Sequence, residues 1–334
     1  MDSKEVIYLY HEDVLIIGGG PCGMSAAIEL QNAGYKPIII EKENIVNTIY
    51  NFPTHQTFFS SSDKLEIGDV PFITENKKPV RNQALVYYRE VASRENLRIK
   101  TFEKALNVKK LPNEKFQVDT LTKNSLKNTY ISNKVIIATG YYDQPNYMNV
   151  PGENLNKVMH YFKEAHPYFN KDIVIVGGKN SAVDASLELH KAGARSITVL
   201  YRGSTYSKSI KPWILPEFDS LIRKGEVQMI FNAHVSEITD TFVHYTVDGQ
   251  HHKVKNDFVF AMTGYRPNIA FLENAGVIVD KESGRPQYNE STYETNIPGL
   301  YIAGVVTSGF NNNAIFIENG RFHGQAIKDA IMNK

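Results

Sequence analysis

The order of apolar and polar positions near the start of the chain is that of a strand, a helix and a second strand. An apolar run over 13–17 predicts a buried strand, and it opens directly into three glycines. Apolar and small residues at helical spacing then predict a helix over 24–34, with Gly34 as its C-terminal cap. The apolar run that follows predicts a second strand ending at Glu41. This order defines a βαβ unit.

The same order returns in the middle of the chain. Residues 171–203 repeat the strand, glycine turn, helix, Ala-Gly stop and strand, which indicates a second unit of the same design. The last predicted strand, ending at Gly304, and the final helix after it resemble a return to the first unit. We therefore expect an α/β fold with two Rossmann-like dinucleotide-binding domains, the second inserted into the first: 1–150 with 270–334, and 151–269.

The segments between the two units are less regular. Residues 44–82 are rich in Phe, Ser and Thr and include His55, so this segment is either a wall over a flat aromatic cofactor or a packed surface loop. A helix is predicted over 84–95, followed by alternating strands typical of an antiparallel meander. That meander feeds back into an inner strand over 135–140, which stops at a small-residue turn containing Thr139 and Gly140.

Composition and charge exclude several classes of partner. The chain of 334 residues has 37 basic and 36 acidic side chains and a net charge of +1, which gives no field to recruit nucleic acid or an anionic membrane. It has one cysteine, which rules out an internal disulfide framework and suits a reducing cytoplasm. No membrane-spanning run or signal peptide is recognised, and no metal site is assigned.

The first glycine turn has the spacing of a dinucleotide-binding fingerprint. Gly18, Gly20 and Gly23 follow a strand and open a helix, where glycine permits a tight turn and close approach of the backbone to a pyrophosphate. The start of the helix favours the negative charge of a phosphate. Glu41, at the end of the second strand, is placed to accept hydrogen bonds from an adenosine ribose.

The second glycine turn departs from this pattern. Gly177 and Gly178 are present, but Lys179 stands where the second glycine of the fingerprint belongs. Tyr201 and Arg202 end the second strand, and there is no acidic residue at 200–203. An arginine there can bind a 2′-phosphate and stack on adenine, so this site should prefer NADPH to NADH. Arg202 could equally be a solvated strand end.

These features in this order resemble the two-domain flavoproteins of the thioredoxin reductase branch. Longer stretches, notably 51–72, 160–169 and 206–218, are similar to the bacillithiol disulfide reductases. The resemblance implies FAD on the first unit, NADPH on the second, and a homodimer or larger homo-oligomer. The residues it assigns to FAD are Gly18, Gly20, Pro21, Cys22, Gly23, Glu41, Lys42, His55, Thr139, Gly140, Gly304 and Ile315. Those it assigns to NADPH are Gly177, Gly178, Lys179, Asn180, Ser181, Tyr201 and Arg202.

The chain departs from thioredoxin reductases at two places. Their C-x-x-C pair falls where this chain has His160 to Lys163, so the flavin-to-dithiol relay cannot run and protein thioredoxin is not the expected substrate. The Gly-Asp pair that meets the ribityl chain is Gly304-Val305 here, and we assign no side-chain role to Val305.

Cys22 then has two interpretations. In the family it resembles, the matching cysteine is the proposed redox residue that exchanges with oxidised bacillithiol; otherwise it is a small residue filling a tight loop. A helix N-terminus lowers the pKa of a thiol, whereas the FAD pyrophosphate opposes that shift. His160, Lys163, Glu164 and His166 are candidates for protonating the leaving thiolate, and each could also be structural.

The sequence thus predicts a cytoplasmic FAD enzyme that takes hydride from NADPH and reduces a low-molecular-weight disulfide, bacillithiol disulfide. Two other enzyme classes share the paired fingerprints: flavin monooxygenases, and ferredoxin- or flavodoxin-type NADPH reductases. A redox sensor that binds both nucleotides without turnover is a further alternative.

Overall fold

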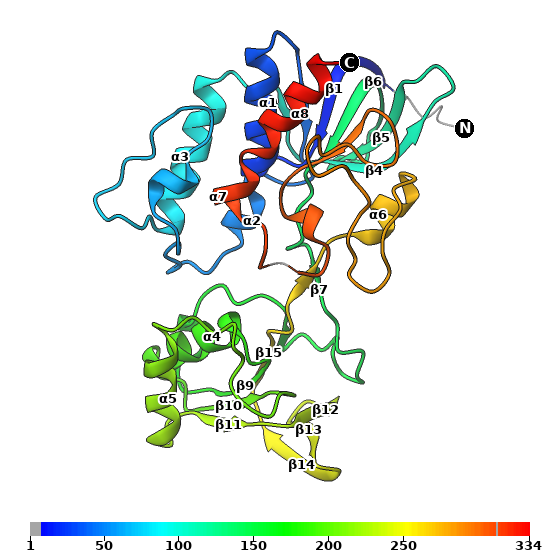
Figure 1. Ribbon diagram of the computed structural model, residues 1–334. Helices are drawn as coiled ribbons and strands as arrows, with labels where there is room; N and C mark the ends of the chain where they lie inside the picture. Colours follow the sequence, from blue (N-terminus) through cyan, green and yellow to red (C-terminus); the bar gives the residue numbers. More distant parts are fainter. Residues whose placement is uncertain (1–7, 312) are drawn as a thin grey trace. The chain divides into compact units, whose positions relative to one another are not determined.

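The computed structural model describes residues 8–311 and 313–334 and divides into two compact units. Unit 1 comprises 1–50, 55–144 and 266–334, and unit 2 comprises 51–54 and 145–265. The expected boundaries at 150 and 270 lie a few residues beyond these points, and the short segment 51–54 groups with unit 2. The chain passes between the units along β7 (Gln144–Pro145) and β16 (Tyr265–Arg266), which pair with each other (Figure 1).

Unit 1 is built on one mixed sheet in the order β3-β2-β1-β6-β5-β4, with β17 also paired to β6. Strands β3, β2, β1, β6 and β17 run parallel, and β4, β5 and β6 form the expected antiparallel meander. The strands are β1 (Tyr8–Ile17), β2 (Ile38–Ile40), β3 (Ile99–Lys100), β4 (Glu103–Lys110), β5 (Phe116–Thr122), β6 (Lys127–Ile137) and β17 (Leu300–Ile302).

The long strand β6 belongs to both parts of this sheet. Its first half pairs with β5, while its last residues, 135–137, pair with β17 and the end of β1. The run that the sequence places in an inner strand over 135–140 is therefore the end of a longer strand. The carboxyl-terminal parts of the parallel strands, 14–17, 38–40, 135–137 and 300–302, are apolar and buried, as a sheet covered on both faces requires there. The start of β1 is exposed or half-buried, and the first part of β6 alternates between buried and partly exposed residues.

Helices cover this sheet, and two of them come from opposite ends of the chain. α1 and α8 pack against each other (Figure 1). The single closing helix expected from the sequence is a 3₁₀ turn followed by two helices. The helices of unit 1 are α1 (Pro21–Asn32), α2 (Asn47–Tyr50), α3 (Arg81–Arg94), α6 (Ile269–Asn274), α7 (Ile317–Gly320) and α8 (His323–Met332), with 3₁₀ turns η1 (Ser62–Leu65) and η3 (Gly304–Ser308).

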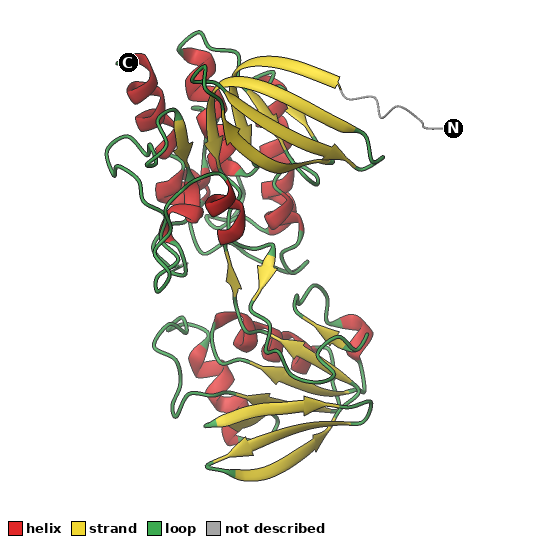
Figure 2. Cartoon of the chain, turned by 90° about the vertical axis from the view of Figure 1, so that its right-hand side faces the viewer, coloured by secondary structure: helices red, strands yellow, loops and turns green. Residues whose placement is uncertain are grey.

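Unit 2 has a parallel sheet in the order β11-β10-β9-β15-β8 and a separate three-stranded antiparallel sheet, β12-β13-β14; Figure 2 shows the strands of this unit in yellow. The parallel sheet comprises β8 (Val158–Met159), β9 (Asp172–Val176), β10 (Ser196–Leu200), β11 (Gln228–Ile230) and β15 (Phe258–Ala261). The antiparallel sheet comprises β12 (Ala233–Ile238), β13 (Phe242–Val247) and β14 (Gln250–Lys255). The helices are α4 (Asn180–Lys191) and α5 (Leu215–Arg223), with a 3₁₀ turn η2 (His166–Tyr168).

Candidate active site

The parallel strands of unit 1 end level with one another and so gather the predicted first-site residues at one edge. The registers place Ile17 beside Ile40 and Ile137, and Ile302 beside Ile137. The residues that follow each strand are therefore neighbours, although the chain separates them widely. Ligands of open α/β sheets bind at this carboxyl edge. The predicted residues brought together there are Gly18, Gly20, Pro21, Cys22, Gly23, Glu41, Thr139, Gly140 and Gly304.

Three glycines of the first turn are required for different reasons. A Cβ on Gly18, which has φ +114°, would lie 2.4 Å from the Ala138 carbonyl oxygen. A Cβ on Gly23 would lie 2.1 Å from the Gly18 carbonyl oxygen, so Gly23 allows α1 to pack against the turn. A Cβ on Gly20 would meet no protein atom within 4 Å, and Gly20 has ordinary extended backbone. The open space at Gly20 fits the close approach of a pyrophosphate.

Glu41 lies beside this turn and organises it. Its Oε2 accepts a hydrogen bond from Gly19 N–H at 2.6 Å, and its Oε1 accepts one from Glu43 N–H at 2.9 Å. Burial raises the pKa of the Glu41 carboxyl, while these two backbone hydrogen bonds oppose the rise. A carboxylate has about four acceptor positions, so Glu41 can still accept from ribose hydroxyls. The remaining acceptor positions of Glu41 therefore fit the ribose hydroxyls in the adenosine half of a dinucleotide.

The Cys22 thiol is enclosed by two glycines from the C-terminal part of the chain. A Cβ on Gly304 would lie 3.0 Å from the Cys22 Sγ, and a Cβ on Gly320 would lie 2.9 Å from it. A side chain at either position would therefore force the sulfur to shift. The Ile315 side chain adjoins the same place, since its Cγ2 would lie 3.2 Å from a Cβ on Gly320.

Burial also sets the protonation of this thiol. Cys22 as a whole residue is half-buried. Burial of its thiol raises the pKa of Cys22 to about 12, so the thiol carries its proton at neutral pH in this arrangement. Because the thiolate is the nucleophile, Cys22 can attack a disulfide only after the thiol is uncovered or its proton is taken. Cys22 is the protein's only cysteine.

Two residues assigned to the first site are engaged elsewhere or lie outside this cluster. Lys42 forms an ion pair with Asp143 at 2.8 Å. His55 is exposed in the irregular segment between α2 and η1. Neither side chain is needed to form the glycine turn.

One further side chain at this edge has no signal in the sequence pattern. His323, at the start of α8, is 3% exposed and accepts a hydrogen bond from Gly304 N–H at its Nδ1, at 3.1 Å. His323 lies far along the chain from the glycine turn at Gly18 and belongs to no dinucleotide-binding fingerprint, so the sequence pattern does not point to it.

Protonation of His323 should make stability depend on pH. Burial lowers the pKa of His323 to about 4, below the value of about 6.5 for an unfolded histidine. The unfolded chain therefore binds the proton more readily, and the contribution to stability, complete above pH 6.5, falls by about 3 kcal/mol as the pH drops to 4. Urea unfolding of the wild type and His323→Phe across this range measures it. Carboxylates change the free energy of unfolding with pH equally in both proteins, so the difference between the two pH dependences gives the contribution of His323. The same pH dependence in both proteins would contradict the assignment.

In unit 2 the glycine turn is covered by Tyr201. A Cβ on Gly177, which has φ +141°, would lie 2.4 Å from the Met262 carbonyl oxygen. Cβ atoms on Gly178 and Gly203 would lie 2.3 and 2.4 Å from the Tyr201 ring, so both glycines make room for that ring. Arg202, the next residue, is exposed at the end of β10.

The start of α4 carries the other residues predicted for the second site. Lys179 is the exposed N-cap of α4, and Ser181 is exposed in its first turn. The Asn180 side chain instead anchors a loop: its Nδ2 donates to the Ser209 carbonyl at 2.9 Å, and its Oδ1 accepts from Lys211 N–H at 3.0 Å. The Asn180 side chain thus fixes the loop that follows Arg202.

Aromatic packing occupies the place of the missing C-x-x-C pair. Phe162 is buried, and Tyr161 stacks on Tyr265 with centroids 5.1 Å apart. The His160 Nε2 lies 3.7 Å from the Glu153 Oε1, and burial lowers the pKa of His160. The other candidate proton donors of this segment, Lys163, Glu164 and His166, are exposed.

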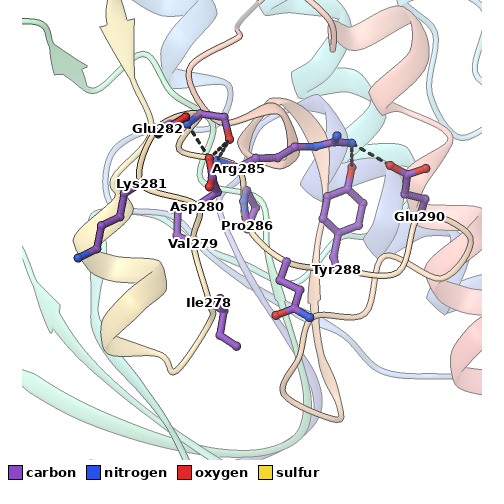
Figure 3. A pocket seen from close by; sticks show the side chains of 11 residues that line it. Ile278, Val279, Asp280, Lys281, Glu282, Arg285, Pro286, Tyr288 and Glu290 are labelled. Atoms are coloured by element: carbon purple, nitrogen blue, oxygen red, sulfur yellow. Dashed lines mark hydrogen bonds and ion pairs between the residues drawn. The ribbon is translucent and has the colours of Figure 1, made fainter.

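An open pocket of about 700 Å³ lies elsewhere in unit 1, along residues 278–290 (Figure 3). Arg285 donates there to Glu290 at 2.9 Å and to the Tyr288 hydroxyl at 3.4 Å. None of the predicted site residues lines it. Pocket size alone therefore does not locate the candidate active site.

Two further findings concern the described residues. None of their helices is long and apolar enough to cross a membrane. They include no group of three or more His, Cys, Asp or Glu residues arranged to hold a metal ion.

Comparison with known proteins defines the class. The family model described as pyridine nucleotide-disulphide oxidoreductase matches residues 15–304, so the chain belongs to that family of oxidoreductases. The predicted α/β fold with two Rossmann-like units is confirmed.

The similarity to particular relatives extends over nearly the whole chain. The chain is 59% identical to the bacilliredoxin reductase Bdr of Bacillus subtilis, over 98% of this chain and 99% of that protein. It is 62% identical to the bacillithiol disulfide reductase Bdr (YpdA) of Bacillus cereus, with a TM-score of 0.95 over 97% and 99% of the two chains. The corresponding enzyme of Staphylococcus aureus is 55% identical, with a TM-score of 0.92 over 97% and 99%. The resemblance predicted from the sequence is confirmed.

Proposed function

We propose that this protein is an NADPH-dependent, FAD-containing disulfide reductase and that its substrate is bacillithiol disulfide. The observation that carries this proposal is the position of Cys22: the protein's only thiol lies in the glycine turn, against Gly304. The names of two relatives in solved structures, bacillithiol disulfide reductases at 62% and 55% identity, support the substrate.

The first site would hold FAD. The open space at Gly20 and the first turn of α1 would take the pyrophosphate, and the Glu41 carboxylate would accept from the ribose. Bound FAD would accept a hydride from NADPH and supply two electrons for the reduction of a disulfide.

Cys22 would exchange directly with the substrate. Its thiolate attacks one sulfur of the disulfide, which forms a mixed disulfide and releases one bacillithiol. Two electrons, which NADPH would supply through FAD, and two protons then cleave this mixed disulfide, which returns Cys22 to the thiol and releases the second bacillithiol. Since burial keeps Cys22 protonated, we infer that the thiol must be uncovered or give up its proton to a base before this exchange.

The acceptor is tested by anaerobic NADPH oxidation. The purified protein is supplied separately with bacillithiol disulfide, glutathione disulfide, bacilliredoxin carrying a bacillithiol mixed disulfide, and ferredoxin. We expect the highest kcat/KM with bacillithiol disulfide. A higher kcat/KM with bacilliredoxin would instead identify bacilliredoxin as the substrate, in agreement with the name of the Bacillus subtilis relative.

Two outcomes would overturn the proposal itself. The first is that no disulfide raises NADPH oxidation above the background rate. The second is that turnover requires oxygen and inserts it into a substrate, which would make the protein a monooxygenase. Fast reduction of ferredoxin without disulfide turnover would instead favour a ferredoxin reductase.

Arg202 should set the preference for NADPH over NADH. We expect Arg202→Ala to raise the KM for NADPH about 10- to 100-fold, the effect of losing one charge-assisted hydrogen bond to a phosphate. The KM for NADH should rise much less, because NADH has no 2′-phosphate and would lose only the stacking of Arg202 on adenine. Steady-state kinetics with both cofactors measures this, and Lys208→Ala, an exposed basic residue in the following loop, serves as the control. Equal losses with both cofactors would contradict the assignment.

The proposal includes a cytoplasmic homodimer or homotetramer. The single cysteine is consistent with a reducing compartment. Light scattering of the purified protein tests the assembly, and a monomer at micromolar concentration would contradict it.

A further inference from the structure

The backbone of Gly304 is held on both sides by side chains that follow it in the chain. Its N–H donates to the His323 Nδ1 at 3.1 Å, and its carbonyl accepts from the Thr307 hydroxyl at 2.8 Å. Gly304 has φ +78°, a conformation that glycine adopts readily and other residues rarely do. Glycine backbone is flexible, and these two hydrogen bonds hold the Gly304 backbone in place.

His323 is suited to act as the acceptor in this pair. A backbone N–H can only donate, so Nδ1 must be unprotonated and the ring must carry its proton on Nε2. The ring is 3% exposed and stacks on Tyr293, with centroids 4.0 Å apart and planes 22° apart. The imidazole is thus held in one orientation and one tautomer.

The start of α8 gives His323 a rigid base. A Cβ on Gly324 would lie 2.6 Å from the Ala26 Cα, so α8 approaches the backbone of α1 closely at this point. The carbonyl of Arg321, just before α8, accepts from the Ser25 hydroxyl at 2.6 Å. α1 also carries Cys22 near its start, so the helix bearing the thiol and the helix bearing His323 are joined directly.

Gly304 forms one wall of the space that holds the Cys22 sulfur. A Cβ on Gly304 would lie 3.0 Å from that sulfur, which places the Gly304 backbone in contact with the thiol. Displacement of Gly304 would therefore uncover Cys22 on this side. Gly320 forms an adjoining part of the wall, since a Cβ on it would lie 2.9 Å from the sulfur and 3.4 Å from the Gly304 Cα.

We propose that His323 is a positioning residue: by accepting from Gly304 N–H, it keeps Gly304 against the Cys22 thiol and controls how readily that thiol meets an electrophile. If this acceptor is lost, the Gly304 N–H is left buried without a partner. A movement of Gly304 that exposes this N–H to water then becomes more favourable in free energy. The importance of this control for turnover rests on the proposed redox role of Cys22. The contact itself does not depend on that role.

Alkylation of Cys22 tests the inference whatever the electron acceptor is. Because the protein has one cysteine, iodoacetamide modification followed by mass spectrometry reports this thiol alone. The holoprotein is used, with FAD content measured before and after reaction. His323→Phe keeps an aromatic ring for the stack and removes the acceptor, whereas His323→Asn offers an amide oxygen near the position of Nδ1.

We expect His323→Phe to raise the alkylation rate about tenfold, the factor given by loss of one buried hydrogen bond. His323→Asn should return the rate to within about threefold of the wild type by restoring the acceptor. Ile327→Ala, which removes a buried side chain one turn further along α8, is the control for general loss of stability, and its rate should stay near that of the wild type.

Three results would overturn the inference. His323→Phe alkylated as slowly as the wild type would show that His323 does not restrain the thiol. His323→Asn alkylated as fast as His323→Phe would show that the acceptor is not what matters. Ile327→Ala alkylated as fast as His323→Phe would show that destabilisation of α8 is sufficient. A failed NADPH assay with a positive alkylation result would leave the contact established and the disulfide reductase function disproved.

Discussion

Cys22→Ser is expected to lower disulfide turnover by roughly three orders of magnitude or more, because a hydroxyl cannot form a mixed disulfide. Serine is smaller than cysteine and fits the space between Gly304 and Gly320 without collision. The glycine turn should therefore keep its conformation and the protein its FAD. The measurements are anaerobic NADPH oxidation with bacillithiol disulfide, the FAD content from the visible spectrum, and the rate of flavin reduction by NADPH in a stopped-flow instrument.

The result separates the two interpretations of Cys22. Loss of turnover with normal FAD content and normal flavin reduction would support exchange at the cysteine. Turnover within a few-fold of the wild type would show that Cys22 only fills the loop. Cys22→Ala is the matched control: it also lacks the thiol and should behave like Cys22→Ser if the chemistry, and not the shape, is what matters.

The second large effect separates the fold of the glycine turn from its cofactor. Gly23→Ala would place a Cβ 2.1 Å from the Gly18 carbonyl oxygen, which forces α1 away from the turn. We expect this variant to lose about 3 kcal/mol of stability as well as FAD. Gly20→Ala meets no protein atom within 4 Å and should leave the stability of the FAD-free protein unchanged.

Gly20→Ala should nevertheless weaken FAD binding about 100-fold, since its methyl group occupies the space proposed for the pyrophosphate. Urea unfolding of the FAD-free proteins and titration of FAD by fluorescence give the two quantities. The same chemical change, three residues apart, should thus affect either the fold and the cofactor or the cofactor alone. Normal FAD affinity in Gly20→Ala would mean that the dinucleotide does not approach the backbone there.

The sequence pattern was informative wherever local order decides structure. The two strand-glycine-helix-strand units and the antiparallel meander follow from short-range periodicity, and the fold class is confirmed. The boundaries were less predictable, because the inner strand expected at 135–140 is the end of the longer β6. A single strand that pairs with different partners along its length gives no local mark at the point where they change.

The surroundings of Cys22 could not be predicted for a related reason. Gly304 and Gly320 lie against the thiol, and His323 accepts a hydrogen bond from Gly304, all from the far end of the chain; the pattern around each of them predicts only a turn or a helix. The sequence likewise assigned Asn180 to the cofactor, whereas its side chain anchors the loop at Ser209 and Lys211. That assignment remains a prediction for its backbone. Such contacts between distant segments form only when the sheet is assembled, so the local sequence pattern does not reveal them.

Because β6 belongs to both parts of the sheet, the order of synthesis on the ribosome affects when unit 1 can fold. β6 cannot pair with β17, and α1 cannot pack against α8, until nearly the whole chain has been synthesised. Nearly all of unit 2, which lies in the continuous stretch 145–265, is complete well before then. We therefore expect the middle of the chain to fold first during synthesis, whereas the unit whose synthesis begins first is completed only when β17 and α8 have been made.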